Sequence, residues 1–315
     1  MYYMEFKLNF SPSPDDERDF IFSSSKDYPE ELDYSDELQP IRNQGSQGSC
    51  YAQSACCMKE WQEKRDYGLD EYLSPQFFYN NRYNIYDNNR DNDYGMYGRD
   101  VMRLLRSIGV CLERNYKYGL IEDRSEIPES CYEEALNHRI KSYARVNDMD
   151  QLKKSLFRNG PCLIGFPVYN KGVQMWQKKE GETNTYGGHA MTVIGYNKEG
   201  FIIRNSWGKY WGLNGYCIYP YEDWGAHWEI WTTVDDESEI IKPKADDVEE
   251  SDEEPIPPPP SPVPLPPPPP TPEYESEIDE VVSDEYTDDN DEGYESDTEE
   301  DTHIRRIECP FCVIL

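Results

Sequence analysis

The stretch Gln44-Gly-Ser-Gln-Gly-Ser-Cys50-Tyr-Ala52 places a cysteine directly after a turn rich in glycine and serine. The spacing of Ala, Met and Trp over residues 51–65 predicts a helix packed in a core, with Cys50 at its N-terminus. The helix dipole and the unpaired amides at that end favour a thiolate over a thiol. Taken alone, the segment is better explained by a buried structural thiol such as Cys56 or Cys57.

A second segment, Gly187-Gly-His189-Ala190, leads into an apolar run that ends at Ile194 and predicts a buried strand. A third segment, Arg204-Asn205-Ser-Trp207-Gly208, follows a second apolar run, Phe201–Ile203. A hairpin of these two strands would bring Asn205 alongside His189. If the Asn205 side-chain oxygen accepts a hydrogen bond from one ring nitrogen of His189, it fixes the tautomer of the ring. The other ring nitrogen then faces the Cys50 sulfur.

The three segments together supply a nucleophile, a base and an orienting amide, which acyl transfer through cysteine requires. Cys50 and His189 are 139 positions apart, inside the roughly 130–150 typical of papain-type enzymes. The chain therefore resembles the papain/cathepsin family of cysteine peptidases. It is most similar to a non-secreted branch without a long prosegment, found in microbes and large DNA viruses.

Further landmarks of that branch lie between about residues 12 and 235: Pro14–Asp19, Leu73–Phe77, Gly109 with Glu113, Gly160–Pro161, Trp211–Tyr216 and Pro220–Glu222. The resemblance implies an α+β, papain-like two-lobe fold. A helical lobe would carry Cys50, and a β-rich lobe would carry His189 and Asn205. We expect an N-terminal extension over residues 1–25, a peptidase domain over 26–235, and a disordered acidic and proline-rich tail over 236–315.

The resemblance also implies the roles of individual residues. Gln44 would donate its side-chain amide to the oxyanion, together with the backbone N–H of Cys50. Trp207 would shield the His189–Asn205 hydrogen bond from water, and Gly95 or Gly98 would lie along the substrate backbone. The implied substrates are polypeptides, with no cofactor and no metal. Of the other histidines, His138 and His227 lack comparable sequence context, and His303 lies in the tail.

Acidity is concentrated in the tail, where residues 236–315 hold 27 Asp and Glu against 4 Lys and Arg. Residues 255–272 contain 13 prolines, a composition that indicates disorder with a stiff polyproline II stretch. The stretch is either a solvated spacer or a docking site for a polyproline-binding domain. The negative charge would repel nucleic acid, so no nucleic-acid partner is expected.

The last four residues, Cys312-Val-Ile-Leu315, match a C-a-a-X prenylation signal. Lipidation of Cys312, with Cys309 as a second acceptor, would tether the protein to a membrane. The pair also matches a C-x-x-C redox or metal motif, although only three residues follow it.

Residues 1–10 lack the features of a secretory signal, and no run approaches transmembrane length. We expect a cytoplasmic protein (in the host cytoplasm or the virion if viral), with reduced, buried thiols at Cys56, Cys57, Cys111, Cys131, Cys162 and Cys217. Gln47 stands where secreted relatives carry a disulfide-forming cysteine. Only 49 residues precede Cys50, so inhibition by a long prosegment is not expected.

Two other functions remain open. One is a membrane-tethered scaffold whose papain-like domain binds peptides with little activity, although such a module has no physical need for the whole catalytic set. The other is transglutaminase-like acyl transfer, which more often uses Asp than Asn to orient the histidine. Asn205 therefore favours the peptidase.

Overall fold

The computed structural model describes residues 6–84, 95–119, 127–178 and 184–234, together with the backbone of Ile240 and Ile241. Apart from those two isoleucines, the predicted tail lies outside the described residues. This holds for the polyproline stretch 255–272 and for Cys309 and Cys312. Among the described helices, none is both long and apolar enough to cross a membrane.

The helical lobe is built around α1 (Cys50–Tyr67), which begins at the predicted residue and is buried from Cys50 through Glu63. The other helical segments are η1 (Ser35–Glu37), α2 (Pro75–Asn80), η2 (Asn81–Asn84), α3 (Gly98–Ser107), α4 (Glu129–Ala135) and η4 (Leu136–His138). Ser74 caps α2, since its hydroxyl accepts from the Phe77 N–H at 3.0 Å; Ser at the cap followed by Pro at the first helical position is a common way to begin a helix.

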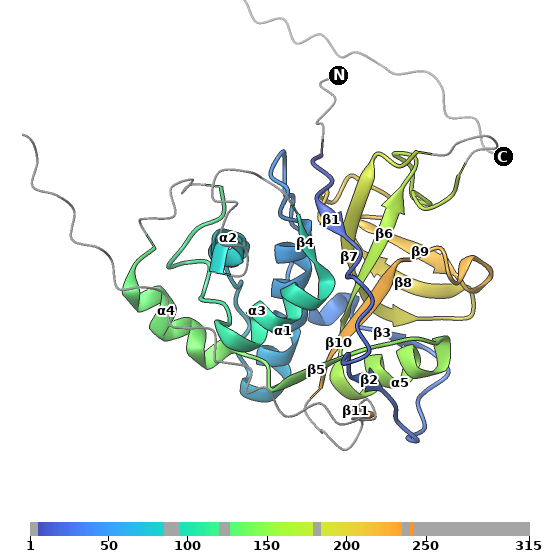
Figure 1. The fold of residues 1–315 in the computed structure, drawn as a ribbon, viewed down its shortest axis with the longest axis horizontal. Helices are drawn as coiled ribbons and strands as arrows, with labels where there is room; N and C mark the ends of the chain where they lie inside the picture. The colour runs from blue at the N-terminus through green and yellow to red at the C-terminus, as the bar shows by residue number, and fades with distance from the viewer. Residues whose placement is uncertain (1–5, 85–94, 120–126, 179–183, 235–239, 242–315) are drawn as a thin grey trace, which may run out of the picture. The chain divides into compact units, whose positions relative to one another are not determined.

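The β-rich lobe is formed by strands of one mixed sheet (Figure 1). Its strands are β2 (Ile21–Phe22), β3 (Leu32–Asp33), β5 (Ser142–Arg145), β6 (Cys162–Val168), β7 (Gly187–Tyr196), β8 (Gly200–Arg204), β9 (Tyr216–Pro220), β10 (Glu229–Val234) and β11 (Ile240–Ile241). The order is β11-β2-β5-β10-β6-β7-β8-β9, with β3 paired to β7. The two strands predicted around His189 and Asn205 are β7 and β8, and they form an antiparallel pair with a bulge between Val193 and Gly195.

Each lobe has its own apolar core, which explains why the chain folds as α+β with two lobes. One cluster lies among the helices and includes Phe77, Leu104 and Leu105; the other includes Phe166, Val193 and Phe201 on the sheet. Helix α5 (Met149–Asn159) packs against β7 and β10 of the sheet, whereas α1 contacts both β6 and β7. The side of α1 that faces the sheet therefore forms the boundary between the lobes.

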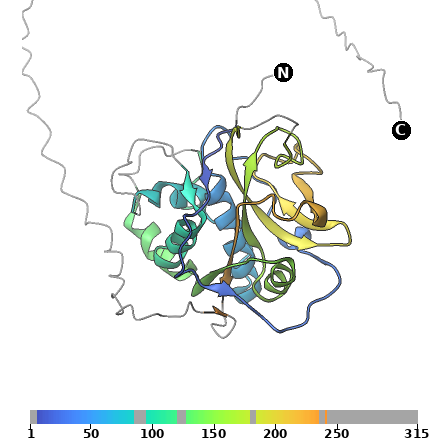
Figure 2. The same ribbon diagram turned by 45° about the vertical axis from the view of Figure 1, so that its right-hand side comes forward.

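A two-residue strand from the N-terminal region, β1 (Phe10–Ser11), also lies at this boundary. It pairs in parallel with β4 (Met96–Tyr97) of the helical lobe and contacts β7 of the sheet. Both ribbon views show the N-terminal segment running between the helices and the sheet (Figures 1 and 2). A η5 turn (Tyr221–Asp223) completes the described elements.

An ion-pair cluster, buried at Glu60 and partly buried at Arg42 and Glu113, joins α1 to the loops before and after it. Arg42 lies 2.5 Å from the Glu60 carboxylate and also pairs with Glu113. The same Glu60 oxygen accepts from the Leu73 N–H at 2.9 Å. Burial raises the pKa of Glu60, and the Arg42 charge opposes that shift. The cluster thus fixes the chain that leads into Gln44 and Cys50.

Glu60→Ala should lower the free energy of unfolding by about 3–5 kcal/mol, because it leaves Arg42 short of a partner inside the protein. Urea denaturation followed by circular dichroism measures this change. The control is Glu71→Ala, which removes an exposed partner of Arg114 and should leave the unfolding midpoint in place. Equal effects of the two substitutions would contradict the prediction.

Candidate active site

Cys50 is the first residue of α1, and its sulfur meets strand β7. The backbone N–H of Ala190 donates to the Cys50 Sγ at 3.5 Å. Helix α1 is held in register at this end by the Gln53 N–H, which donates to the Ser49 carbonyl at 3.0 Å. The structure therefore places Cys50 at a helix N-terminus and next to the residue that follows His189.

His189 and Asn205 are joined by a hydrogen bond of 2.7 Å between Nε2 and Oδ1. The Ser206 backbone N–H donates to the same Oδ1 at 2.7 Å, which identifies that atom as the amide oxygen. Because an oxygen here can only accept, His189 Nε2 must carry a proton. In the neutral ring the lone pair is then on Nδ1, which has no hydrogen-bond partner among the described residues.

Trp207 covers the histidine ring. The two rings are stacked, with centroids 4.4 Å apart and planes inclined by 27°, and Trp207 is itself buried. Trp211 makes an edge contact with Trp207. These aromatic side chains surround the ring with apolar surface, which strengthens an enclosed hydrogen bond.

Gln44 lies in the same group and is held from both lobes. Its Oε1 accepts from the Ser206 hydroxyl at 2.7 Å, and its backbone N–H donates to the Ser206 carbonyl at 2.8 Å. Its Nε2 donates to the carbonyls of Gln47 at 3.0 Å and Lys7 at 3.3 Å. The amide is thus oriented with its donor group toward backbone carbonyl oxygens.

The structure brings together the four candidate catalytic residues selected from the sequence, Cys50, His189, Asn205 and Gln44. Trp207 lies beside them. Ser206 and Lys7 were not selected. Ser206 follows Asn205 directly, but nothing in the sequence indicates that its hydroxyl fixes the Gln44 amide. The contact with Lys7 joins residues 37 positions apart, so only the tertiary fold shows it.

Burial lowers the pKa of His189 to about 4, and the hydrogen bond to Asn205 opposes that shift. Removing an imidazolium from water is costly. Without a negative charge nearby, the His189 ring is therefore neutral near pH 7. A negative charge on the Cys50 sulfur would favour the protonated ring again.

The other described histidines have structural partners. His138 Nδ1 lies 2.9 Å from the Glu63 carboxylate, and His227 Nδ1 lies 2.9 Å from the Tyr219 hydroxyl. The predicted buried thiols at Cys56, Cys57, Cys111, Cys131, Cys162 and Cys217 are confirmed as free and buried. Burial raises the pKa of Cys162 to about 11 and of Cys217 to about 12. These thiols are therefore protonated and unreactive near neutral pH.

Residues 28–227 match the family described as "Papain family cysteine protease", and the chain belongs to that family. An uncharacterized peptidase C1-like protein of Acanthamoeba polyphaga mimivirus is 30% identical over 200 residues, which cover 57% of this chain and 64% of the viral protein. Mouse cathepsin K is 30% identical over 211 residues, covering 60% of this chain and 59% of cathepsin K. The chain thus spans less than two thirds of either relative.

Solved structures show the same architecture. Xylellain, a cysteine protease from Xylella fastidiosa, superposes with a TM-score of 0.64 at 28% identity, covering 72% of this chain and 95% of xylellain. A digestive procathepsin L 3 of Tenebrio molitor gives a TM-score of 0.56 at 18% identity, covering 69% of this chain and 74% of that structure. The predicted α+β papain-like fold is confirmed.

The lowered pKa of His189 predicts a pH-dependent loss of stability. The unfolded chain takes up a proton on this ring near pH 6.5, whereas the folded protein resists it down to about pH 4. Stability from the neutral ring is therefore present above pH 6.5 and lost as the pH falls to 4, by about 3 kcal/mol. Urea unfolding of Cys50→Ala at pH 7 and pH 4 measures the loss without a thiolate.

The control is Cys50→Ala/His189→Gln, in which the carboxylates still titrate but the imidazole is absent. The difference between the two proteins isolates the ring. Identical pH dependence in both proteins would show that His189 is not protected from protonation.

Proposed function

We propose that this protein is a cysteine endopeptidase that hydrolyses peptide bonds in polypeptides through a thioester on Cys50. The observation that carries the proposal is the His189–Asn205 hydrogen bond of 2.7 Å, on a strand whose next amide contacts the Cys50 sulfur. This arrangement joins a nucleophile, a base and an orienting group in a site without solvent exposure.

In the acylation step, His189 Nδ1 takes the proton of the Cys50 thiol. The resulting thiolate lies at the N-terminus of α1, where the helix dipole stabilises negative charge. The imidazolium beside it is stabilised in turn by the thiolate and by Asn205. Sγ then attacks the substrate carbonyl carbon, and the imidazolium protonates the leaving amine as the C–N bond breaks.

In the deacylation step, His189 Nδ1 removes a proton from a water molecule that attacks the thioester carbon. The C–S bond breaks, the peptide leaves as a carboxylic acid, and the sulfur regains its proton from the ring. Asn205 holds the ring in one orientation throughout, so it is a positioning residue. Trp207 limits access of water to the bond that fixes this orientation.

In both steps negative charge develops on the substrate carbonyl oxygen. The Gln44 Nε2 group and the Cys50 N–H are the donors we assign to it. Support for Gln44 comes from its Ser206 hydrogen bond, which holds the amide with its nitrogen toward a peptide carbonyl of Lys7. A substrate carbonyl would replace the Lys7 carbonyl at that nitrogen.

Covalent labelling tests the proposal against the alternative of a peptide-binding scaffold of little activity. An epoxide selective for papain-type thiolates should form a single adduct on Cys50, detected by intact mass and peptide mapping. The labelled protein should no longer hydrolyse fluorogenic peptides, and Cys50→Ala should neither be labelled nor show activity. Labelling without hydrolysis of any peptide would favour the scaffold.

Gln44→Glu should reduce kcat by about 10²–10³-fold, since it removes one oxyanion donor while preserving shape. KM should change far less, because the donor acts mainly on the transition state. Steady-state hydrolysis of a fluorogenic peptide gives both constants. Ser206→Ala is the matched control: it frees the Gln44 Oε1 but keeps the donor, so its kcat should fall less than that of Gln44→Glu.

The tail extends this proposal. We propose that prenylation of Cys312, supported by its C-a-a-X context, tethers the protease to a cytoplasmic membrane surface. The proline-rich residues 255–272 would recruit a polyproline-binding domain. Incorporation of a labelled isoprenoid should be lost in Cys312→Ser and retained in Cys309→Ser. Equal incorporation in both variants would contradict the assignment.

A further inference from the structure

A small cavity lies behind the catalytic group, where α1 packs against the sheet. Its volume is about 10 Å³, and its wall is formed by polar side chains from α1, β7 and the end of β8, among them Gln53, Arg204 and Asn205. A cavity of this size holds about one water molecule, provided that two to four polar groups can bind it. The chemistry of the wall therefore decides whether water belongs there.

Asn205 contributes an N–H group to this wall. Its Oδ1 accepts from His189 Nε2 and from the Ser206 backbone N–H, both at 2.7 Å. Its Nδ2 is buried and has no hydrogen-bond partner among the described residues. Buried N–H groups in proteins are almost always paired with another protein group or with ordered water. The cavity is the place where this nitrogen can find such a partner.

Gln53 contributes a second amide. It lies about one turn after Cys50 in α1, and only 4% of its surface is exposed. Neither its Oε1 nor its Nε2 has a hydrogen-bond partner among the described residues. Burying an amide without any hydrogen bond destabilises a protein, so this side chain requires a ligand that can both donate and accept. Water meets that requirement.

Arg204 contributes a third polar group, and its charge disfavours an apolar occupant. Its side chain is buried and donates to the Tyr216 hydroxyl at 3.3 Å and to the Pro40 carbonyl at 3.0 Å. A guanidinium has five N–H groups, so donors remain for the cavity. A water oxygen there can accept from Asn205 and Arg204, while one of its O–H groups donates to the Gln53 Oε1.

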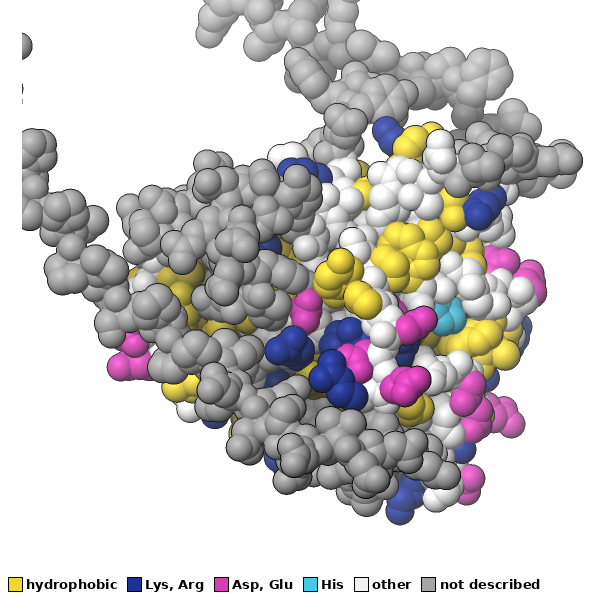
Figure 3. Space-filling model, viewed as in Figure 1, with side chains coloured by type: hydrophobic (Ala, Val, Ile, Leu, Met, Phe, Trp, Pro, Cys, Tyr) yellow, Lys and Arg dark blue, Asp and Glu magenta, His cyan; other side chains and the backbone are white. Residues whose placement is uncertain are grey.

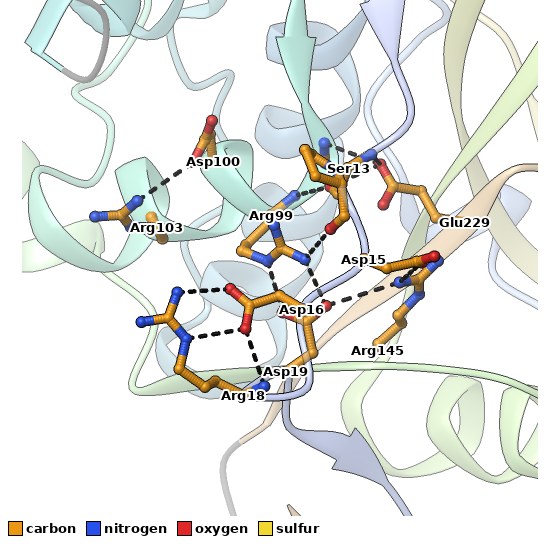
Figure 4. Close-up of polar contacts among 12 residues, drawn as sticks. Ser13, Asp15, Asp16, Arg18, Asp19, Arg99, Asp100, Arg103, Arg145 and Glu229 are labelled. Carbon is orange, nitrogen blue, oxygen red and sulfur yellow. Dashed lines mark hydrogen bonds and ion pairs between the residues drawn. The ribbon is translucent and has the colours of Figure 1, made fainter. Parts of the chain in front are cut away.

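At another point where the lobes meet, polar side chains pair directly. Glu229 Oε1 accepts from the Ser13 hydroxyl at 3.1 Å, and Arg99 Nε lies 2.6 Å from the Asp19 carboxylate (Figure 4). Figure 3 shows charged side chains of both signs side by side on the surface that it draws. The wall behind the catalytic group differs, because its two amides make no hydrogen bond with each other.

We propose that Gln53 is a positioning residue: through one water molecule in the cavity it holds Asn205 Nδ2, and so keeps Oδ1 of Asn205 on His189. The inference rests on the proposed peptidase function, whose catalytic group it extends. The physical reason is that an amide can turn over. A reversed Asn205 would point its NH2 group at two donors, the His189 Nε2–H and the Ser206 N–H. A water that accepts from Nδ2 on the cavity side favours the productive orientation.

The titratable groups of the cavity wall are Arg42, Arg204 and Cys57. Burial raises the pKa of the Cys57 thiol, so this thiol is neutral near pH 7, whereas both guanidinium groups are charged. Glu60 pairs with Arg42, and burial raises its pKa. These groups are the same in every variant compared below, so a difference in pH dependence among the variants does not come from them.

Three variants of the full-length chain test the proposal. Gln53→Met fills nearly the same space and suits a helix, but it cannot bind the water. Gln53→Glu is the conservative variant, since it keeps an acceptor oxygen in the place of Oε1. The matched control is Gln62→Met, a buried position of the same helix whose Nε2 donates to the Thr233 hydroxyl at 2.6 Å.

Two quantities are measured: hydrolysis of a fluorogenic peptide and the rate of epoxide labelling at Cys50 as a function of pH. Gln53→Met should lower kcat by about tenfold, as expected for the loss of one buried hydrogen bond, with little change in KM. The hydrogen bond from Asn205 raises the pKa of His189. The upper pH limit of labelling should therefore move to lower pH when that bond is loosened in Gln53→Met.

Gln53→Glu should retain most of the parent's kcat, and Gln62→Met should retain both the kcat and the pH profile. A crystal structure gives a second measurement that does not depend on how well the variants fold. The parent should show electron density for a water molecule within hydrogen-bond distance of Asn205 Nδ2 and Gln53 Oε1. An empty cavity, or a bromide ion bound there after soaking, would overturn the proposal.

Equal loss of kcat in Gln53→Met and Gln62→Met would reveal a purely structural effect and overturn the positioning role, while the peptidase function would stand. Unchanged kinetics in Gln53→Met would overturn it as well. If none of the proteins hydrolyses a peptide but the labelling profile still shifts in Gln53→Met alone, the peptidase function is rejected and the positioning role of Gln53 stands.

Discussion

Helix α1 is enclosed by α2 and α3 on one side and by β6 and β7 on the other, and the rest of the structure depends on this packing. The enclosure fixes the position of the helix N-terminus, and with it the Cys50 sulfur, to within van der Waals contact of β7. Since β7 carries His189 and its partner β8 leads to Asn205, one interface aligns residues from three parts of the chain. Packed interiors deform little, so the alignment is rigid.

Burial also governs the chemistry at this interface. An imidazole removed from water resists protonation, which is why the pKa of His189 falls to about 4. The same apolar surroundings strengthen its hydrogen bond to Asn205 and its attraction to a thiolate. The site is thus a low-dielectric region in which a charge on the sulfur and a charge on the ring would stabilise each other.

Enclosure has a further consequence for control. A buried nucleophile is protected, but it must be exposed before a polypeptide can reach it. In this chain residues from the N-terminal region lie against the site: the Lys7 carbonyl accepts from the Gln44 amide, and Phe6 stacks on Trp207. The Ser206 hydroxyl, which orients the Gln44 amide, therefore also orients the group that binds the Lys7 carbonyl.

Reading the amino-acid sequence was enough to predict the class of fold, the start of α1 and the strands around His189 and Asn205. It was also enough to select Cys50, His189, Asn205, Gln44 and Trp207. The start of α1, the two strands and the choice of Cys50, His189 and Asn205 follow from local periodicity, turn residues and the order of reactive side chains along the chain. The class of fold and the roles of Gln44 and Trp207 came from the resemblance of these segments to the papain family. Three contacts appear only once the chain is folded: that of Ser206 with Gln44, that of Ser13 with Glu229, and that of Lys7 with Gln44. Each joins residues separated by tens to hundreds of positions, as in the Ser13–Glu229 contact across 216 residues, and such contacts depend on how the two lobes pack rather than on any local pattern.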